Sequence, residues 1–272
     1  MTTPADEREA RFTLADPLAE ALRLVGLAED RGILVRLMGG LAFHAQAPDW
    51  TARVGRANRD IDLATRGRDR KALADLLEAE GYTPDRRYNT LYGQKQLYFV
   101  DVARQRPVDV LVDRFEMCHR FELAGRLEVM RPTLPLAELL LSKLQVVRIN
   151  RKDVLDALIL LGEHPLGPGD HAAHPTAPVP TISTGRIVEL TSTDWGWWRT
   201  ATANLAVLRT FLEGDLRPGE LEVGRPLRFD PAAQIDALRG AIDTAPKSSR
   251  WKVRARVGDR MGWYEEPEEI PH

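Results

Sequence analysis

Apolar and polar positions in the first third of the chain alternate between helix and strand periods. Apolar residues at roughly helical spacing predict a helix over 17–31, and the apolar run 33–38 predicts a strand directly after it. Gly39 and Gly40 follow at once, and a short helical pattern occupies 41–46. The expected order is therefore helix, strand, glycine turn and second helix.

Strand patterns become more frequent further along. The polar and basic segment 49–59 predicts a loop, and 60–64 then alternates acidic and apolar residues, as a half-exposed strand does. An amphipathic helix is predicted over 68–80, and two strands are predicted over 97–102 and 108–112. The first 115 residues are therefore expected to be mixed α/β.

The second half of the chain has a different pattern. A long helical period covers 136–161, with a break expected near Asn150. Proline, glycine and histidine concentrate in 162–180, which is typical of a linker, and helical patterns return over 193–214 and 231–242. No internal repeat is present.

These patterns predict four parts. They are an α/β domain over 1–125, a helical segment over 126–165, a Pro/Gly-rich linker over 166–185 and a mainly helical region over 186–272. With 272 residues, of which 43% are hydrophobic, the chain can bury a sizeable core.

Net charge, the length of apolar runs and the cysteine content exclude several classes of protein. The net charge of -2 gives no overall field for a nucleic acid or a membrane surface, so any basic surface must be local. The longest apolar runs, such as 134–141, are too short to span a bilayer, and the N-terminus lacks the pattern of a secretory signal. A lone Cys118 excludes an internal disulfide. We therefore expect a cytoplasmic protein without a membrane partner.

Three aspartates form the main candidate for chemistry. Asp60 and Asp62 are separated by one residue on a predicted strand, so both carboxylates should face the same side. Hard oxygen ligands at that spacing suit Mg²⁺, and Asp109 on another strand could complete a site for two ions. Asp101 and Asp113 are the alternatives for this third acid, and a solvated strand edge is the alternative for the Asp-x-Asp pair.

The glycine turn fits the same chemistry. Without a Cβ at Gly39 and Gly40, a phosphate could approach the backbone and accept hydrogen bonds at the start of the following helix. Metal ions and phosphate contacts together are what phosphoryl and nucleotidyl transfer require. A Gly-Gly pair alone, however, is usually only a turn.

Three motifs in this order resemble the nucleotidyltransferase superfamily, which includes polymerase β-like, antibiotic and abortive-infection-type toxin enzymes. They are LMGG at 37–40, DIDLAT at 60–65 and VDVL at 108–111. The resemblance implies a nucleotidyltransferase fold with a small mixed sheet, followed by a mainly helical C-terminal region. It also implies that Gly39 and Gly40 bind the NTP, and that the aspartates of the second and third motifs bind two Mg²⁺ ions and act in catalysis.

Two features depart from the superfamily pattern. A serine often follows the first motif glycine, but Gly40 stands here. The spacing from the glycines to Asp60 also looks longer than usual, which implies an inserted loop with Arg53, Arg56 and Arg59. These arginines either meet phosphates or are incidental.

The resemblance continues into ELLLSKLQVVRINRKDVLDALIL at 138–160. It implies that this helical segment closes over the nucleotide, with Lys143 near the phosphates and in catalysis. Arg148 and Asp156 would contribute to nucleotide binding, and Asp153 or Asp156 would have a supporting or catalytic role. The alternative is an ordinary solvated face of an amphipathic helix.

Together these features predict attack of an acceptor on the α-phosphorus of an NTP such as ATP, with release of pyrophosphate. The acceptor stays open between tRNA, a protein and a small molecule, as do the oligomeric state and a toxin-like role. A non-catalytic nucleotide- or RNA-binding module on the same fold is the first alternative, and a metal-dependent glycosyltransferase is the second.

Two aromatic groups also have alternative interpretations. Tyr88, Tyr92 and Tyr98, near Lys95, could stack a base or contact RNA, or they could be ordinary alternating strand residues. The tryptophan-rich segment 195–198 is expected to pack the C-terminal helices, with base stacking or partner binding as the alternative.

Overall fold

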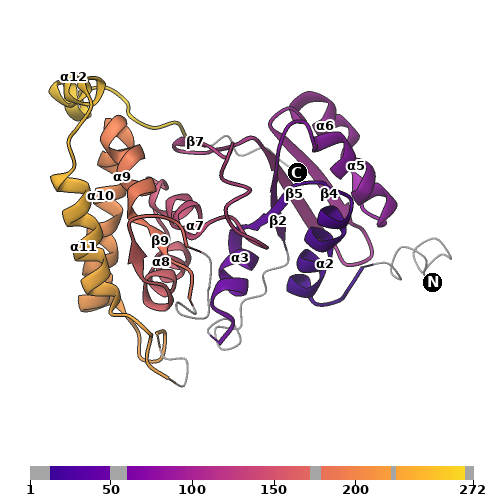
Figure 1. The fold of residues 1–272 in the computed structure, drawn as a ribbon, viewed down its shortest axis with the longest axis horizontal. Coiled ribbons are helices and arrows are strands. Elements are labelled where there is room, and N and C mark those ends of the chain that lie inside the picture. Colours follow the sequence, from indigo (N-terminus) through magenta and orange to yellow (C-terminus); the bar gives the residue numbers. More distant parts are fainter. Residues whose placement is uncertain (1–12, 50–59, 172–178, 222–224, 267–272) are drawn as a thin grey trace. The chain divides into compact units, whose positions relative to one another are not determined.

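The computed structural model divides the chain into two units. It describes residues 13–49, 60–171, 179–221 and 225–266. The first unit comprises Met1–Phe115 and Glu122–Pro135, and the second comprises Glu116–Phe121 and Leu136–His272. The first unit is mixed α/β and the second is mainly helical, so the coarse fold class expected from the patterning is confirmed (Figure 1).

Helices and strands alternate along the first unit. In order they are α2 (Pro17–Asp30), β1 (Val35–Met38), α3 (Gly39–Gln46), β2 (Ile61–Thr65), α5 (Arg70–Ala79), β3 (Thr83–Pro84), α6 (Arg86–Tyr92), β4 (Gln96–Asp101) and β5 (Arg106–Val112). A hairpin of β6 (Arg114–Glu116) and β7 (Arg120–Glu122) follows, and the boundary between the units falls within it.

The sheet of the first unit has the strand order β1-β2-β5-β4-β3. Strands β2 and β5 are parallel, and every other neighbouring pair is antiparallel. Apolar residues of the two parallel strands, such as Ile61, Leu63, Val108 and Val110, are completely buried. Because β2 and β5 run in the same direction at the centre of the sheet, their polar residues come level with each other.

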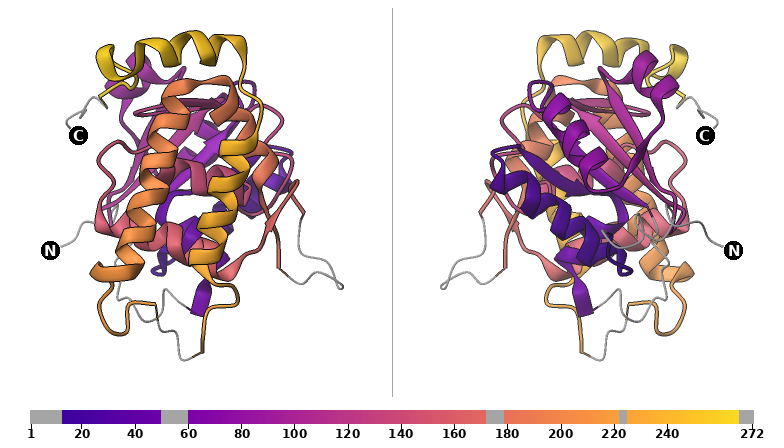
Figure 2. Two further views of the ribbon diagram at one scale, coloured as in Figure 1. Left: turned by 90° about the vertical axis from the view of Figure 1, so that its left-hand side faces the viewer. Right: turned by 90° about the vertical axis from the view of Figure 1, so that its right-hand side faces the viewer.

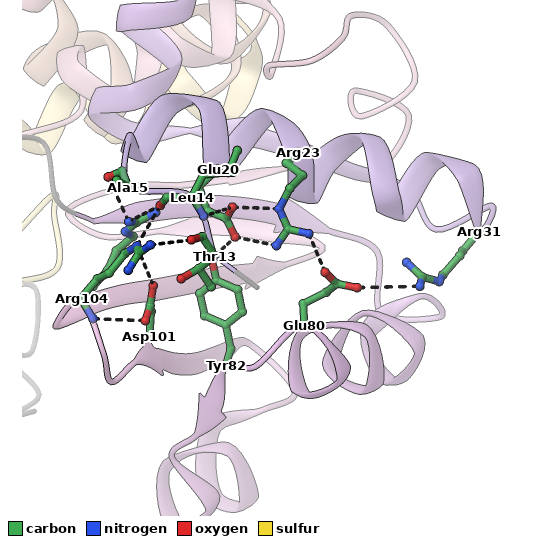
Figure 3. A network of polar contacts seen from close by, with 11 residues as sticks. Thr13, Leu14, Ala15, Glu20, Arg23, Arg31, Glu80, Tyr82, Asp101 and Arg104 are labelled. Atoms are coloured by element: carbon green, nitrogen blue, oxygen red, sulfur yellow. Dashed lines mark hydrogen bonds and ion pairs between the residues drawn. The ribbon is translucent and has the colours of Figure 1, made fainter. Parts of the chain in front are cut away.

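A polar network attaches helix α2 to the sheet (Figure 3). Glu20 is completely buried and accepts hydrogen bonds from the Leu14 backbone, the Arg23 side chain and the Tyr82 hydroxyl. The backbone carbonyls just before α2 accept hydrogen bonds in turn from Arg104 and Arg106. The segment that leads into α2 is therefore fixed by Glu20 of that helix and by the side chains of Arg104 and Arg106.

The segment Glu122–Pro135 completes the first unit. Leu123, Leu127 and Leu134 are buried, and backbone hydrogen bonds of 2.9 Å connect Leu37 with Pro132 and Leu134. These bonds place the segment along the edge of β1, where an open strand would otherwise expose its amide and carbonyl groups.

The second unit is built mainly from helices. They are α7 (Leu136–Leu144), α8 (Arg151–Glu163), α9 (Thr184–Thr193), α10 (Trp195–Thr210), a π-helical turn (Phe211–Asp215), α11 (Pro231–Thr244), α12 (Ser249–Val257) and a 3₁₀ turn (Gly258–Arg260). Helices α10 and α11 run side by side, and α12 crosses near one end of α9 and α10 (Figure 2). Within the described ranges, no helix is both long and apolar enough to cross a membrane.

Several elements differ in extent from the sequence-based predictions. The helix expected over 136–161 is interrupted as predicted: α7 ends at Leu144, and the Asn150 side chain accepts a hydrogen bond from Asp153 N to begin α8. The helix expected over 193–214 was placed wrongly at its start. Asp194 instead separates α9 from α10 by capping the second helix.

The segment 166–185, expected to be a linker, has ends that pair with each other. Strand β8 (Leu166–Gly167) is parallel to β9 (Ile182–Ser183), and the Ser183 side chain accepts a hydrogen bond from Arg186 N at the start of α9. Residues 172–178 lie outside the described part of the chain. The pairing of β8 with β9 thus holds the two ends of this segment together within the second unit.

Candidate functional site

Four residues form a row across the sheet of the first unit. Met38 on β1 is level with Asp62 on β2, Asp62 is level with Asp109 on β5, and Asp109 is level with Tyr98 on β4. Residues that are level on neighbouring strands point to the same face, and the strands lie about 4.8 Å apart. The two carboxylates are therefore neighbours on one face of the sheet.

The glycine turn brings backbone directly against Asp62. Gly39 follows β1 immediately, begins α3 and has a φ of 62°, in the left-handed region that favours glycine. A Cβ atom at this position would overlap with the Asp62 carboxylate. Gly40 continues the first turn of α3, and no side chain caps the start of that helix. The glycine turn and the Asp62 carboxylate are thus in direct packing contact.

Asp109 is oriented by a short chain of hydrogen bonds. The Gln96 amide donates to Oδ1 of Asp109 at 2.6 Å, and the hydroxyl of buried Tyr88 donates to Gln96 Oε1 at 2.9 Å. Burial raises the pKa of Tyr88, and the negative charge of Asp109 adds to this shift. Tyr88 is therefore kept protonated as the donor that fixes the Gln96 amide.

Asp60 lies outside this row, at an exposed position two residues before Asp62. It directly precedes β2, and the strand period places it on the same side of the sheet as Asp62. Burial raises the pKa of the Tyr98 hydroxyl, and the charges of Asp109 and Asp60 raise it further. Both acids therefore lie within electrostatic range of the Tyr98 ring.

Asp101 and Asp113, the alternatives to Asp109 as the third acid, lie elsewhere in the first unit. Asp101 is buried, on the face of β4 opposite to Tyr98, and it accepts a hydrogen bond from the Arg104 backbone. Asp113 has a φ of 63° and accepts a hydrogen bond from Gly67 N at 2.8 Å in a turn. Of these three acids, Asp109 is the one that lies level with Asp62.

The carboxylates of this site could supply only part of the coordination shell of a metal ion. Within the described ranges, no three His, Cys, Asp or Glu side chains come close enough together to hold an ion. Asp62 and Asp109 supply two neighbouring hard carboxylates, however, and Mg²⁺ is commonly held by one or two carboxylates, with phosphate oxygens and water completing its shell. As ligand types, the two carboxylates match part of a Mg²⁺ shell, and they do not form a protein cage.

The other predicted site residues belong to the second unit. Lys143 on α7 forms ion pairs with Asp153 at 2.6 Å and Asp156 at 3.1 Å on α8, and its side chain is 13% exposed. Burial alone would lower the pKa of Lys143, but the charges of Asp156 and Asp153 outweigh it and raise that pKa. Arg148 is exposed between the two helices. The structure thus groups Lys143 with both aspartates, and their contact with a nucleotide stays a prediction.

Gln96 and helix α6 are not among the elements and site residues predicted from the sequence. Three arginines that are among them lie outside the described residues. Gln96 was missed, although it precedes Tyr98 by two residues in an alternating pattern that places both on one face. Tyr88 was noted among the aromatic residues, but its helix α6 was not predicted. Arg53, Arg56 and Arg59 lie outside the described residues.

Comparison with known proteins adds no family assignment. No protein-family model and no curated protein matches this chain. The geometry of Gly39, Asp62 and Asp109, and the chemistry of these residue types, are therefore the grounds on which a function can be proposed.

Proposed function

We propose that this chain is a Mg²⁺-dependent nucleotidyltransferase with a nucleotidyltransferase fold in its first unit. It would transfer an NMP from an NTP to an acceptor and release pyrophosphate. The supporting observation is the level pairing of Asp62 with Asp109, with the Gly39 backbone packed against the Asp62 carboxylate. Transfer to RNA, to a protein and to a small molecule is equally compatible with this pairing.

In this proposal the glycine turn binds the triphosphate. Backbone N–H groups in the first turn of α3 have no side-chain cap, and a helix N-terminus favours anions through its donors and its dipole. Bound Mg²⁺ would neutralise the triphosphate and lower the pKa of the acceptor hydroxyl. Asp62 and Asp109 would hold it there through their carboxylate oxygens.

The transfer exchanges one phosphorus–oxygen bond for another. The acceptor oxygen forms a bond to the α-phosphorus while the bond from that phosphorus to the bridging oxygen breaks, and the electron pair leaves with pyrophosphate. The Asp109 carboxylate accepts the proton of the acceptor hydroxyl. Gln96 fixes the rotation of this carboxylate, so proton transfer needs no rearrangement of the side chain.

A non-catalytic nucleotide-binding module is the second candidate. It is favoured by the lack of a three-ligand cluster among the described residues, since two-metal transfer normally uses more protein ligands than Asp62 and Asp109. This candidate predicts that NTP binds at the glycine turn and that no label moves to an acceptor.

The test uses α-³²P-labelled NTPs. The wild type and the variants Asp62→Asn and Asp109→Asn are incubated with each of the four NTPs and Mg²⁺, with total tRNA, a cell extract or no addition. We expect label on an acceptor with the wild type and a loss of roughly 100-fold or more in each variant, because several kcal/mol of charge stabilisation disappear. Asp75→Asn is the matched control, since Asp75 is exposed and pairs only with Lys71 among the ion pairs described.

Each outcome discriminates between the candidates. Retained transfer by a folded Asp62→Asn protein would rule out the proposed metal site. An unlabelled acceptor pool, together with NTP binding that is weakened in a folded Gly39→Ala variant, would favour the binding module.

A further inference from the structure

The second unit contains a pocket lined by aromatic residues. Its volume is about 670 Å³, and its walls come from the start of α10, from α12 and from residues 118–120 and 261–265. The Glu265 amide donates to the Cys118 carbonyl at 3.0 Å, which connects the last two of these segments. The aromatic side chains that line it are Trp195, Trp197, Trp251, Trp263 and Tyr264.

Cationic side chains already lie over three of these rings: Arg254 is 4.6 Å from the ring centroid of Trp195, Arg199 is 5.6 Å from that of Trp263, and Lys247 is 5.9 Å from that of Trp251. Trp195 and Trp263 meet edge to face, with ring centroids 6.3 Å apart, and Trp251 meets Trp198 edge to face at 5.3 Å. The buried Nε1 of Trp251 also donates to no acceptor within the described chain.

Positive charge is concentrated on the helix that forms one wall. Between Ala245 and Gly258 the chain has five Lys or Arg residues and no Asp or Glu, although the whole chain carries -2. Arg250 and Arg254 line the pocket one helical turn apart. Lys252 and Arg256 are exposed on the same helix and extend the charge beyond the pocket.

The other charged groups of the pocket leave it cationic. Asp194 accepts hydrogen bonds from the backbone of Gly196 and Trp197, so its carboxylate is used as a helix cap. Glu265 is the other acid in the lining. Burial lowers the pKa of His119 to about 4, so this ring is neutral at pH 7 and the arginines provide the positive charge.

We propose that this pocket and α12 bind a single-stranded nucleic acid, with an unpaired base among the tryptophans and successive phosphates along the basic helix. Stacking on aromatic rings combined with a cationic track is how proteins hold single strands. A duplex would keep its bases paired and could not use the aromatic walls, and an acidic peptide would use the charges alone. The volume suits one nucleotide, and the exposed cations of α12 suit a strand that continues outside.

Strand binding at this pocket does not depend on the proposed transfer reaction. Its readout is binding by the full-length protein, measured as fluorescence anisotropy of a labelled 12-nucleotide strand of mixed sequence, as RNA and as DNA. The Asp62→Asn variant is expected to bind with unchanged Kd, so loss of transfer activity and loss of strand binding can be distinguished.

The charge test compares two triple variants. Arg250→Gln/Lys252→Gln/Arg256→Gln changes exposed residues of α12, and Arg68→Gln/Lys71→Gln/Arg131→Gln removes the same charge from exposed positions of the first unit. Arg254 is left unchanged, because it donates to the carbonyls of Gly258 and Met261. We expect about a 10-fold or greater loss of affinity for the first triple at low salt, together with a shallower salt dependence, and little change for the second.

The stacking test uses Trp251. Trp251→Ala should weaken strand binding by about 10-fold or more, and Trp251→Phe should restore most of the affinity because it keeps an aromatic face. Thermal melts of both variants distinguish loss of binding from loss of folding. Equal binding by folded Trp251→Ala and wild-type protein would overturn the stacking role.

Competition identifies the occupant. Unlabelled strand should displace the probe at far lower concentration than AMP, a matched duplex or poly-glutamate. Displacement by AMP at the same concentration as the strand would make this a mononucleotide pocket, and equal displacement by poly-glutamate would make α12 a surface for acidic proteins. Either result, equal affinity of the two triple variants, or absence of binding by the wild type would overturn the proposal.

Discussion

At the scale of single residues, the contact between Gly39 and Asp62 is the tightest constraint in the candidate site. The backbone conformation at Gly39 is left-handed, and the carboxylate occupies the space of a Cβ. Gly32 has a similar φ of 69° against 62° at Gly39, but a Cβ on Gly32 would meet nothing within 4 Å. Comparing alanine substitutions at these two glycines therefore separates the cost of a left-handed alanine from the cost of displacing Asp62.

Gly39→Ala should lower stability by more than Gly32→Ala does. Both substitutions place alanine in the left-handed region, at a cost of about 1–2 kcal/mol, but only the first also displaces Asp62. Chemical denaturation measures the difference, and the assay with labelled NTPs should show that only Gly39→Ala loses transfer. Equal activity of both variants would contradict the importance of the contact.

The sequence predicts part of this site for a clear reason. Period-two spacing places Asp60 and Asp62 on one face, and the Gly-Gly pair after an apolar run locates the turn. Level pairing of Asp62 with Asp109 depends on strand register, which spacing along the chain does not contain. The contact of Gln96 with Asp109 also needs β4 beside β5, so only the folded sheet reveals it.

At the scale of elements, the network around Glu20 connects α2 with the strands and with α5. Arg23 bonds to both Glu20 and Glu80, so the acid at the end of α5 is joined to α2 through one guanidinium (Figure 3). Burial alone would raise the pKa of Glu20, but hydrogen bonds from Arg23, Leu14 and Tyr82 outweigh it and lower the pKa below its usual value of 4.5.

Glu20→Gln should lower the free energy of unfolding by roughly 2–4 kcal/mol at pH 7, since it removes the charge from a buried, hydrogen-bonded network. A lowered folded pKa stabilises the protein above the unfolded pKa, and this stability is lost as the pH falls through the folded pKa. Urea denaturation between pH 7 and pH 3 should therefore show a weaker acid dependence in the variant than in the wild type.

Glu78→Gln is the control for this prediction. Glu78 is 42% exposed and pairs with Arg86 at 3.4 Å, so its removal should cost about 0–1 kcal/mol. If Glu20→Gln and Glu78→Gln had the same small effect at pH 7, the network would contribute little to holding α2.

Long periodic patterns predicted their helices well, and short or polar elements escaped prediction. Helices α2 and α11 each have 14 residues and an apolar stripe, and both were expected. Helix α6 has seven residues, and α12 has nine with none buried, so neither shows a hydrophobic period. Helix α12 is set instead by its Ser248 cap and its contacts with α9 and α10.

At the scale of the whole molecule, the chain leaves the first unit after Phe115, returns at Glu122 and leaves again after Pro135. The returning segment contributes buried leucines and the bonds to Leu37. The predicted domain end at residue 125 falls inside this segment, because composition changes there only gradually.

A fragment of residues 1–135 should fold, and a fragment of residues 1–115 should be unfolded or aggregate. The shorter one lacks Leu123, Leu127 and Leu134 and exposes the edge of β1. Circular dichroism and thermal melts would show a cooperative transition only for the longer fragment. The double substitution Leu123→Asp/Leu127→Asp in that fragment should abolish the transition, whereas cooperative melting of residues 1–115 would contradict the prediction.

The tryptophan-lined pocket has a spectroscopic consequence. Trp195, Trp197, Trp198, Trp251 and Trp263 belong to the second unit, and Trp50 is the sixth tryptophan of the chain. Four of the five tyrosines, at positions 82, 88, 92 and 98, belong to the first unit. In a Trp50→Phe protein, indole emission excited at the red edge would therefore report on the second unit, and the tyrosine bands of the second-derivative absorbance spectrum, which separate from those of tryptophan, would report mainly on the first. The two halves of the chain carry separate optical labels, so their loss of structure can be followed independently in one sample.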